Sequence, residues 1–126
     1  METHTTGTRN IAIGYEAMHD TDAGSTSLGS QDNIFMGYEA GGGTWADAAS
    51  NYNVGIGNYV MDSALDGALY NTAIGFSALS AITTGDHNTT LGYKAGQNMT
   101  TGLYNVIIGS QAGDAASIGN YHVLIG

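Results

Sequence analysis

Three aspartates near the N-terminus could supply oxygen ligands for a cation. Asp20 and Asp22 stand in the segment HDTDAGS, close to Ser25, and Asp32 follows ten residues later. Ca²⁺ is bound by such carboxylate and carbonyl oxygens. The segment lacks the full loop signature of a calcium site, and acidic residues in a polar turn are usually only solvated. Asp20, Asp22 and Asp32 are therefore weak calcium candidates, and no resident metal or cofactor is expected.

The other reactive side chains form no catalytic pattern. The sequence has no nucleophile elbow, no phosphate-binding loop and no His–carboxylate motif. The four histidines share no metal-ligand spacing, although a three-fold axis could gather three copies of one of them; they are His4, His19, His87 and His122. We therefore expect a protein that is not an enzyme.

Aromatic residues recur at one position of the sequence, directly before an Asn or before His122. They are Tyr52, Tyr70, His87, Tyr104 and Tyr121. Stacked coils would place these side chains in a ladder along one edge of the molecule. Exposed aromatic rings could stack on sugars, which makes the four tyrosines candidate binding residues. The same rings could instead pack at a seam between chains or shield a corner.

Trp45 is a further candidate binding residue. It stands in the Gly-rich segment AGGGTWADAAS, within one of the longer connections. Insertions in repeat proteins form loops, often on the binding face. The indole could contact a ligand there, or it could anchor the loop onto its own coil.

An internal repeat must position these residues. A five-residue motif that begins with Asn and ends with Gly recurs at six positions spaced 17 to 23 residues apart, and a seventh copy begins with His. The repeats start at Asn10, Asn33, Asn53, Asn71, Asn88, Asn105 and His122, in steps of 23, 20, 18, 17, 17 and 17 residues. Such a period is too short for a strand–helix unit and suits one coil of a β-solenoid. We expect an all-β fold, a parallel β-solenoid of about seven repeats of 17–23 residues. It would form a single domain over residues 1–126 and, because uncapped coils leave open strand edges, a segment of a longer fibre.

Each repeat carries a short strand between the Asn and the Gly. The first and third residues after the Asn are mostly apolar, which is the alternation of a strand, and the middle residue is often apolar too. We expect the third residues Ile74 and Ile108 to line the coil, and the middle residues Phe35 and Ile107 to face outwards. A strand that is apolar on both faces must be covered on both. No helix long enough to cover the outer face appears, so the sequence predicts that it is covered by further copies of the same polypeptide. The repeated Asn is interpreted as a corner residue whose amide closes the turn or stacks in a ladder.

The composition excludes several classes of partner. The net charge is −9, and Arg9 and Lys94 are the only basic residues besides histidine. Nucleic-acid binding needs clustered Lys and Arg, so that function is excluded, and an anionic membrane surface is disfavoured for the same reason. No run of 18 apolar residues exists, so no membrane insertion is expected. Cysteine is absent, which excludes disulfides and thiolate zinc sites.

The run NTAIGFSALSAITTGDHNTTLGYKAGQNMTTGLYN resembles the repeats of bacteriophage tail fibres and related trimeric adhesins. It is similar to the YadA-like heads of trimeric autotransporters, which share an Asn-(x)-Ala-Ile-Gly strand motif. The resemblance covers nearly the whole sequence and is clearest from Asn71 to Gly113. It implies parallel β-rolls that associate as homotrimers and form a stiff stalk or head that engages a host surface. The period of 17 favours the tail-fibre class, because the autotransporter heads have a shorter one.

The resemblance and the second apolar strand face lead to one functional expectation. The protein would be a structural and adhesive segment of a homotrimeric fibre, on a virion or at a cell surface. Loops around Asp22, Trp45 and Asp62 would contact a host glycan, and repetition would strengthen individually weak contacts.

Two alternatives remain open. One is a self-assembling extracellular filament or matrix protein, in which rods join end to end. The other is an ice-binding solenoid. Its regular Thr array fails, because Leu65–Asp66 and Ser117–Ile118 stand where other repeats carry a Thr pair.

Overall fold

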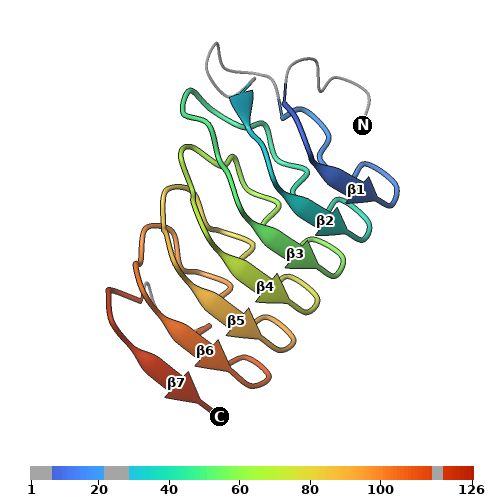
Figure 1. Cartoon of the computed structure of the whole chain (residues 1–126). Helices are drawn as coiled ribbons and strands as arrows, with labels where there is room; N and C mark the ends of the chain where they lie inside the picture. Colours follow the sequence, from blue (N-terminus) through green and yellow to red (C-terminus); the bar gives the residue numbers. More distant parts are fainter. Residues whose placement is uncertain (1–6, 22–28, 115–117) are drawn as a thin grey trace.

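The chain winds into a parallel β-solenoid in the computed structural model, which describes residues 7–21, 29–114 and 118–126 (Figure 1). Each repeat contributes one short strand, and the seven strands form a single parallel sheet in sequence order. They are β1 (Ile11–Ile13), β2 (Ile34–Met36), β3 (Val54–Ile56), β4 (Thr72–Ile74), β5 (Thr89–Leu91), β6 (Val106–Ile108) and β7 (Val123–Ile125). The prediction of an all-β parallel solenoid is therefore confirmed.

Pairing between neighbouring strands follows the repeat. Ile11 pairs with Ile34, and Ile34 pairs with Val54, so the longer first repeats do not shift the register. The extra residues of those repeats must lie in the connections between strands. The connections also bond to one another, since Asp66 N–H donates to the Thr83 carbonyl at 2.8 Å and Thr83 N–H to the Thr100 carbonyl at 2.9 Å. Among the described residues, no helix is long and apolar enough to cross a membrane.

A ladder of asparagine side chains runs inside the coil, directly before the strands. Asn71 Oδ1 accepts hydrogen bonds from the Asn88 backbone N–H at 3.0 Å and from Asn88 Nδ2 at 2.9 Å. Asn71 Nδ2 donates to Asn53 Oδ1 at 3.1 Å and to the Gly85 carbonyl at 2.7 Å. Equivalent pairs of hydrogen bonds, one from the backbone N–H and one from Nδ2, link each Asn of the ladder from Asn33 to Asn105 to the Oδ1 of the Asn before it. Because a buried amide is costly unless it is hydrogen-bonded, this ladder explains why the repeat requires Asn.

The predicted assignment of the two strand faces is wrong. The middle residues Phe35 and Ile107 are fully buried, whereas Ile74 is 39% exposed and Ile108 is partly exposed. The Asn side chain points into the coil to make its hydrogen bonds. Strand alternation then places the second residue after it inside, and the first and third residues outside. The interior of the coil is thus lined by the middle residue of each strand and by residues of the connections.

Side-chain sizes in neighbouring coils compensate for one another in this thin core. A Cβ atom added at Gly55 would lie only 2.6 Å from the ring of Phe35, and one at Gly41 only 2.8 Å from it. The Phe35 ring therefore occupies space that two glycines leave free.

The Gly that ends each strand is required by close stacking of the backbone. Gly75 has a φ of +139°, and a Cβ atom there would collide with the carbonyl of Gly92 in the next coil. The same collision would occur at Gly14, Gly37, Gly57, Gly92 and Gly109. Only glycine adopts this φ without strain and leaves room for the next coil.

Candidate functional site

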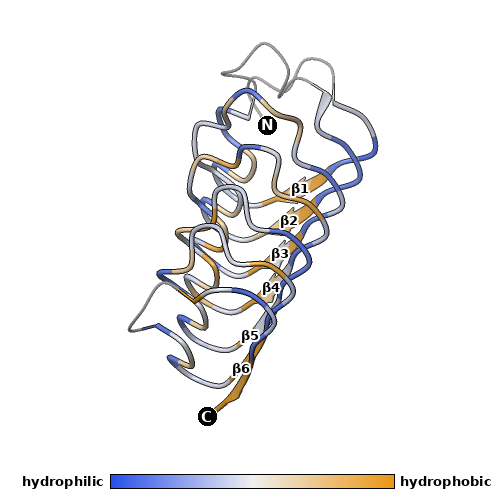
Figure 2. Ribbon diagram, turned by 90° about the vertical axis from the view of Figure 1, so that its left-hand side faces the viewer, coloured by the Kyte–Doolittle hydropathy of each residue, from blue (hydrophilic) through white to orange (hydrophobic). Residues whose placement is uncertain are grey.

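The outer face of the sheet is an exposed apolar surface, which we call the apolar strip. It consists of the first and third residues of each strand, and large side chains remain accessible along it, including Ile13 (55%), Leu91 (47%) and Ile125 (77%). Figure 2 shows hydrophobic residues following one another along the sheet. The members are Ile11, Ile13, Ile34, Met36, Val54, Ile56, Thr72, Ile74, Thr89, Leu91, Val106, Ile108, Val123 and Ile125. Large contiguous apolar surfaces of soluble proteins are typical of interaction sites, so the apolar strip is the first candidate site of this protein.

An aromatic ladder borders the apolar strip at the corner before each Asn, and we call it the tyrosine–histidine ladder. It contains Tyr52, Tyr70, His87, Tyr104 and Tyr121, in agreement with the predicted stacking. Consecutive ring centroids lie 4.8, 4.8, 4.7 and 5.2 Å apart, and the ring planes differ by 4° to 14°. All five residues have φ between 57° and 62°, the left-handed conformation of the corner.

Stacking changes what this ladder can bind. Nearly parallel rings cover one another's faces, so the ladder presents mainly ring edges and hydroxyl groups to solvent. A sugar ring needs an open aromatic face to stack on. Tyr121, the last member and 74% exposed, is the ring best placed to offer one.

An ion pair takes the place of aromatic residues at the same corner in the first two coils. The Asp32 carboxylate accepts hydrogen bonds from Arg9 Nε at 2.6 Å and from an Arg9 terminal nitrogen at 2.7 Å. This hydrogen bonding to Arg9 lowers the pKa of Asp32. Asp32, one of the weak calcium candidates, is thus already engaged by a cationic side chain.

The other calcium candidates form no site in the described ranges. Asp20 Oδ2 lies 3.4 Å from His19 Nδ1, and Asp22 lies outside the described residues. Within residues 7–21, 29–114 and 118–126, no group of three or more His, Cys, Asp or Glu side chains is arranged to hold a metal ion.

A second aromatic ladder borders the other side of the apolar strip, and sequence reasoning missed it as a site. It contains Tyr15, Tyr38, Tyr59, Phe76 and Tyr93, whose consecutive centroids lie 5.3 to 5.6 Å apart. The sequence feature that could have revealed this ladder is the aromatic residue that follows the Gly of most repeats. Tyr59 is displaced by one position in the sequence, yet its ring joins the ladder edge-on to both neighbours. A hydrogen bond to Glu39, together with desolvation, raises the pKa of Tyr38 to about 12.

Trp45 lies inside the coil and is fully buried. Its Nε1 donates to the Gly41 carbonyl at 3.1 Å, and its ring meets Phe35 edge-on at 5.9 Å. Of the two roles that the sequence left open for Trp45, the structure therefore supports the second, in which the indole anchors the connection onto its own coil. Asp62, in the next coil, is half-buried, and desolvation raises its pKa.

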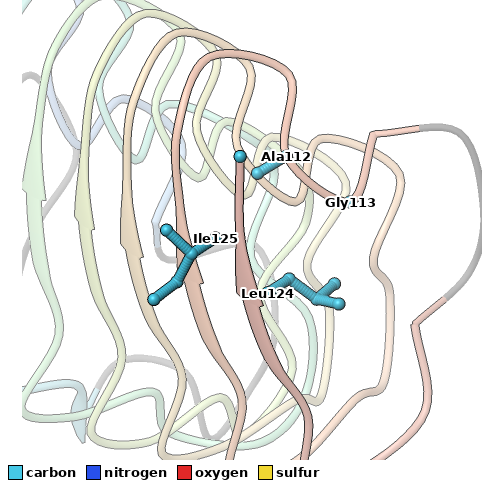
Figure 3. Close-up of a pocket in the computed structure, with 5 residues that line it drawn as sticks. Ala112, Gly113, Leu124 and Ile125 are labelled. Carbon is cyan, nitrogen blue, oxygen red and sulfur yellow. The ribbon is translucent and has the colours of Figure 1, made fainter.

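A hollow opens at the coil that ends with β7. It is lined by Ala112, Gly113, Leu124, Ile125 and Gly126, and Figure 3 shows the Leu124 and Ile125 side chains on opposite sides of the strand. In the preceding coils the corresponding space is covered by the next coil.

Comparison with protein-family models, with curated proteins and with solved structures found no match to this chain.

Proposed function

We propose that this protein is a structural and adhesive segment of a homotrimeric fibre, of the viral tail-fibre type, that contacts a host-surface glycan. Its setting would be a virion or a cell surface. The observation that carries the proposal is the apolar strip, which continues without interruption from β1 to β7. The resemblance of the repeats to tail-fibre and trimeric adhesin sequences supplies the three-fold assembly and the host glycan.

The dimensions of the strip suit an interface between copies of the protein. At about 4.8 Å per strand the apolar strip is about 30 Å long, and with the second aromatic ladder it is about 15 Å wide. The resulting area, about 450 Å², is more than half of the about 800 Å² that each partner buries in a standard protein interface, and it leaves the tyrosine–histidine ladder outside the interface. Burying Ile and Val side chains gains free energy from the hydrophobic effect, and no like-charge pairs oppose it within the strip, because its members are uncharged.

In this proposal neither Trp45, which is buried, nor the ring faces that are covered by stacking contact the glycan. Hydroxyl groups and ring edges of the tyrosine–histidine ladder, together with the polar connections between strands, remain available for hydrogen bonds to sugars. Each such contact is weak, and three chains with repeated coils would act through multivalency.

The mass of the particle in solution tests the assembly. Sedimentation or light scattering of the protein should give three times 12.9 kDa. A monomer that stays soluble at high concentration would refute the trimeric fibre. Binding to immobilised bacterial polysaccharides, measured on the same sample, tests the adhesive part separately.

A substitution within the strip distinguishes assembly from folding. Ile74→Asp places a charge on an exposed strand position, so the coil should still form, while association is lost and the measured mass falls to that of a monomer. Thr101→Asp, at an exposed position in the connection between β5 and β6, is the matched control and should keep the trimer. A trimer that survives Ile74→Asp would show that another surface holds the three copies together.

A second candidate is a filament in which rods join end to end. Polymers whose length grows with protein concentration would support this candidate, whereas a mass independent of concentration favours the discrete trimer.

A further inference from the structure

The tyrosine–histidine ladder contains two tyrosine pairs in face-to-face contact. Tyr52 and Tyr70 have ring centroids 4.8 Å apart and planes that differ by 5°. Tyr104 and Tyr121 have centroids 5.2 Å apart and planes that differ by 4°. His87 separates the two pairs. The four tyrosines are 42% to 74% exposed, so a soluble oxidant can reach them.

We propose that Tyr52–Tyr70 and Tyr104–Tyr121 are sites of oxidative dityrosine cross-linking within one molecule. The first bond would join the coil of β3 to that of β4, and the second would join the coil of β6 to that of β7. The inference does not depend on the proposed function, because both partners of each bond belong to the same molecule.

The reaction needs a one-electron oxidant, for which we name a peroxidase with hydrogen peroxide. Each of the two phenols loses one electron and one proton and becomes a phenoxyl radical. The radicals couple through the ring carbons next to the hydroxyl-bearing carbons, which forms one carbon–carbon bond. The hydrogens on those two carbons then return to the oxygens and restore both phenols. In total two hydrogen atoms leave the pair, and they reduce one hydrogen peroxide to two water molecules.

The local backbone holds the rings ready for this coupling. Tyr70 N–H donates to the Asn51 carbonyl at 3.1 Å, and Tyr121 N–H donates to the Leu103 carbonyl at 2.9 Å. These bonds fix one corner above the next, so the two radicals form side by side and need not diffuse together. Parallel stacking also brings the reacting edges of both rings into register. Tyr38 and Tyr59 lie almost as close, at 5.3 Å, but their planes differ by 68°, which turns the edge of one ring towards the face of the other.

A third stacked pair must be removed for a clean test. Tyr15 and Tyr38 stack with centroids 5.5 Å apart and planes that differ by 9°. Tyr15→Phe keeps the stacked ring and removes its phenol, so this variant serves as the parent protein.

Trypsin separates the two proposed sites, because Arg9 and Lys94 are its only cleavage points in the sequence. The fragment 10–94 carries Tyr52 and Tyr70, and the fragment 95–126 carries Tyr104 and Tyr121. After treatment of the parent protein with peroxidase and hydrogen peroxide, mass spectrometry should show both fragments lighter by two hydrogen atoms and not joined to one another. Dityrosine fluorescence should rise in parallel.

Single substitutions assign each bond. Tyr70→Phe should abolish the mass change in fragment 10–94 only, and Tyr121→Phe should abolish it in fragment 95–126 only. Tyr59→Phe is the matched control, since it removes a close but edge-on tyrosine, and both fragments should still lose two hydrogens. The proposal is overturned if the fragments become joined, if Tyr59→Phe abolishes the change, or if neither fragment changes while free tyrosine is coupled under the same conditions.

Discussion

Thr90, the middle residue of β5, carries a buried hydroxyl oxygen that has no hydrogen-bond partner within the described part of the protein. An unsatisfied buried polar group is destabilising, and Val has nearly the same shape as Thr without the hydroxyl. Thr90→Val should therefore raise the free energy of unfolding by about 1 kcal/mol. Thermal denaturation checks this, with the exposed neighbour Thr89→Val as the matched control for changed β-propensity. A lower melting temperature for Thr90→Val than for Thr89→Val would mean that the hydroxyl does have a partner.

The asparagine ladder makes a contrasting prediction for a residue whose polar groups are all used. In Asn71→Asp a carboxylate replaces the donating amide, so an oxygen would face Asn53 Oδ1 and the Gly85 carbonyl, which now accept hydrogen bonds. A buried, uncompensated charge should lower stability by about 3 kcal/mol or more at pH 7.

Asn58→Asp is the control for that change. Asn58 is exposed and only accepts, from the Tyr38 N–H at 3.0 Å, a role that a carboxylate also performs. Urea denaturation of the two variants should show a large loss for the first and almost none for the second. Equal losses would show that the amide donors of Asn71 contribute little.

The glycines that end the strands allow neighbouring coils to stack closely, so replacing one of them should separate two strands. Gly75→Ala would force a non-glycine residue to φ +139° and drive its Cβ into the Gly92 carbonyl. Strain of this kind costs about 3 kcal/mol, and β4 and β5 should separate. Circular dichroism during heating measures the loss. Gly119→Ala is the control, because the nearest atom to its new Cβ is 3.7 Å away; similar melting temperatures for both variants would contradict the stacking argument.

The strands and their register could be predicted from the sequence because the spacing of the repeat determines both. Their faces could not, since both faces are apolar and hydrophobicity alone does not distinguish them. Side-chain size carried a further signal. The second residues of the strands vary in size, as in Phe35, Gly55 and Ala73, which is typical of a packed interior, whereas the third residues all have large side chains. Similarly, the spacing of the repeat predicted the position of the tyrosine–histidine ladder. The orientation of its rings could not be predicted, because it depends on the left-handed backbone conformation of these residues, and the pattern of apolar residues does not indicate that conformation.

The whole molecule is one-dimensional, because each strand contacts only the strands before and after it. Stability in such proteins is approximately a sum over repeats and their interfaces. Deleting residues 88–104 removes one whole period. It joins His87 to Asn105, so the junction is still a His followed by an Asn, as at His87 and Asn88 in the intact sequence. We expect a folded solenoid with one strand fewer and a lower free energy of unfolding.

Circular dichroism and urea denaturation check this deletion, and removal of residues 88–95 alone is the control. That shorter deletion takes out β5 but leaves part of its coil behind, so it should disrupt the ladder and prevent folding. If the 17-residue deletion also fails to fold, the coils are not interchangeable, and each depends on the particular neighbours that it has.

The asparagine ladder also gives the rod an electrical direction. The carbonyl of each Asn amide points to the following coil and one N–H of the same amide points to the preceding one, so the amide dipoles align along the axis. Backbone amides of a sheet largely cancel, whereas these amide groups, each with a moment close to the about 3.5 D of a peptide unit, add up. Their negative end lies towards β7. Aligned hydrogen bonds polarise one another, so the same Asn→Ala change should weaken the rod more at its centre than near either end.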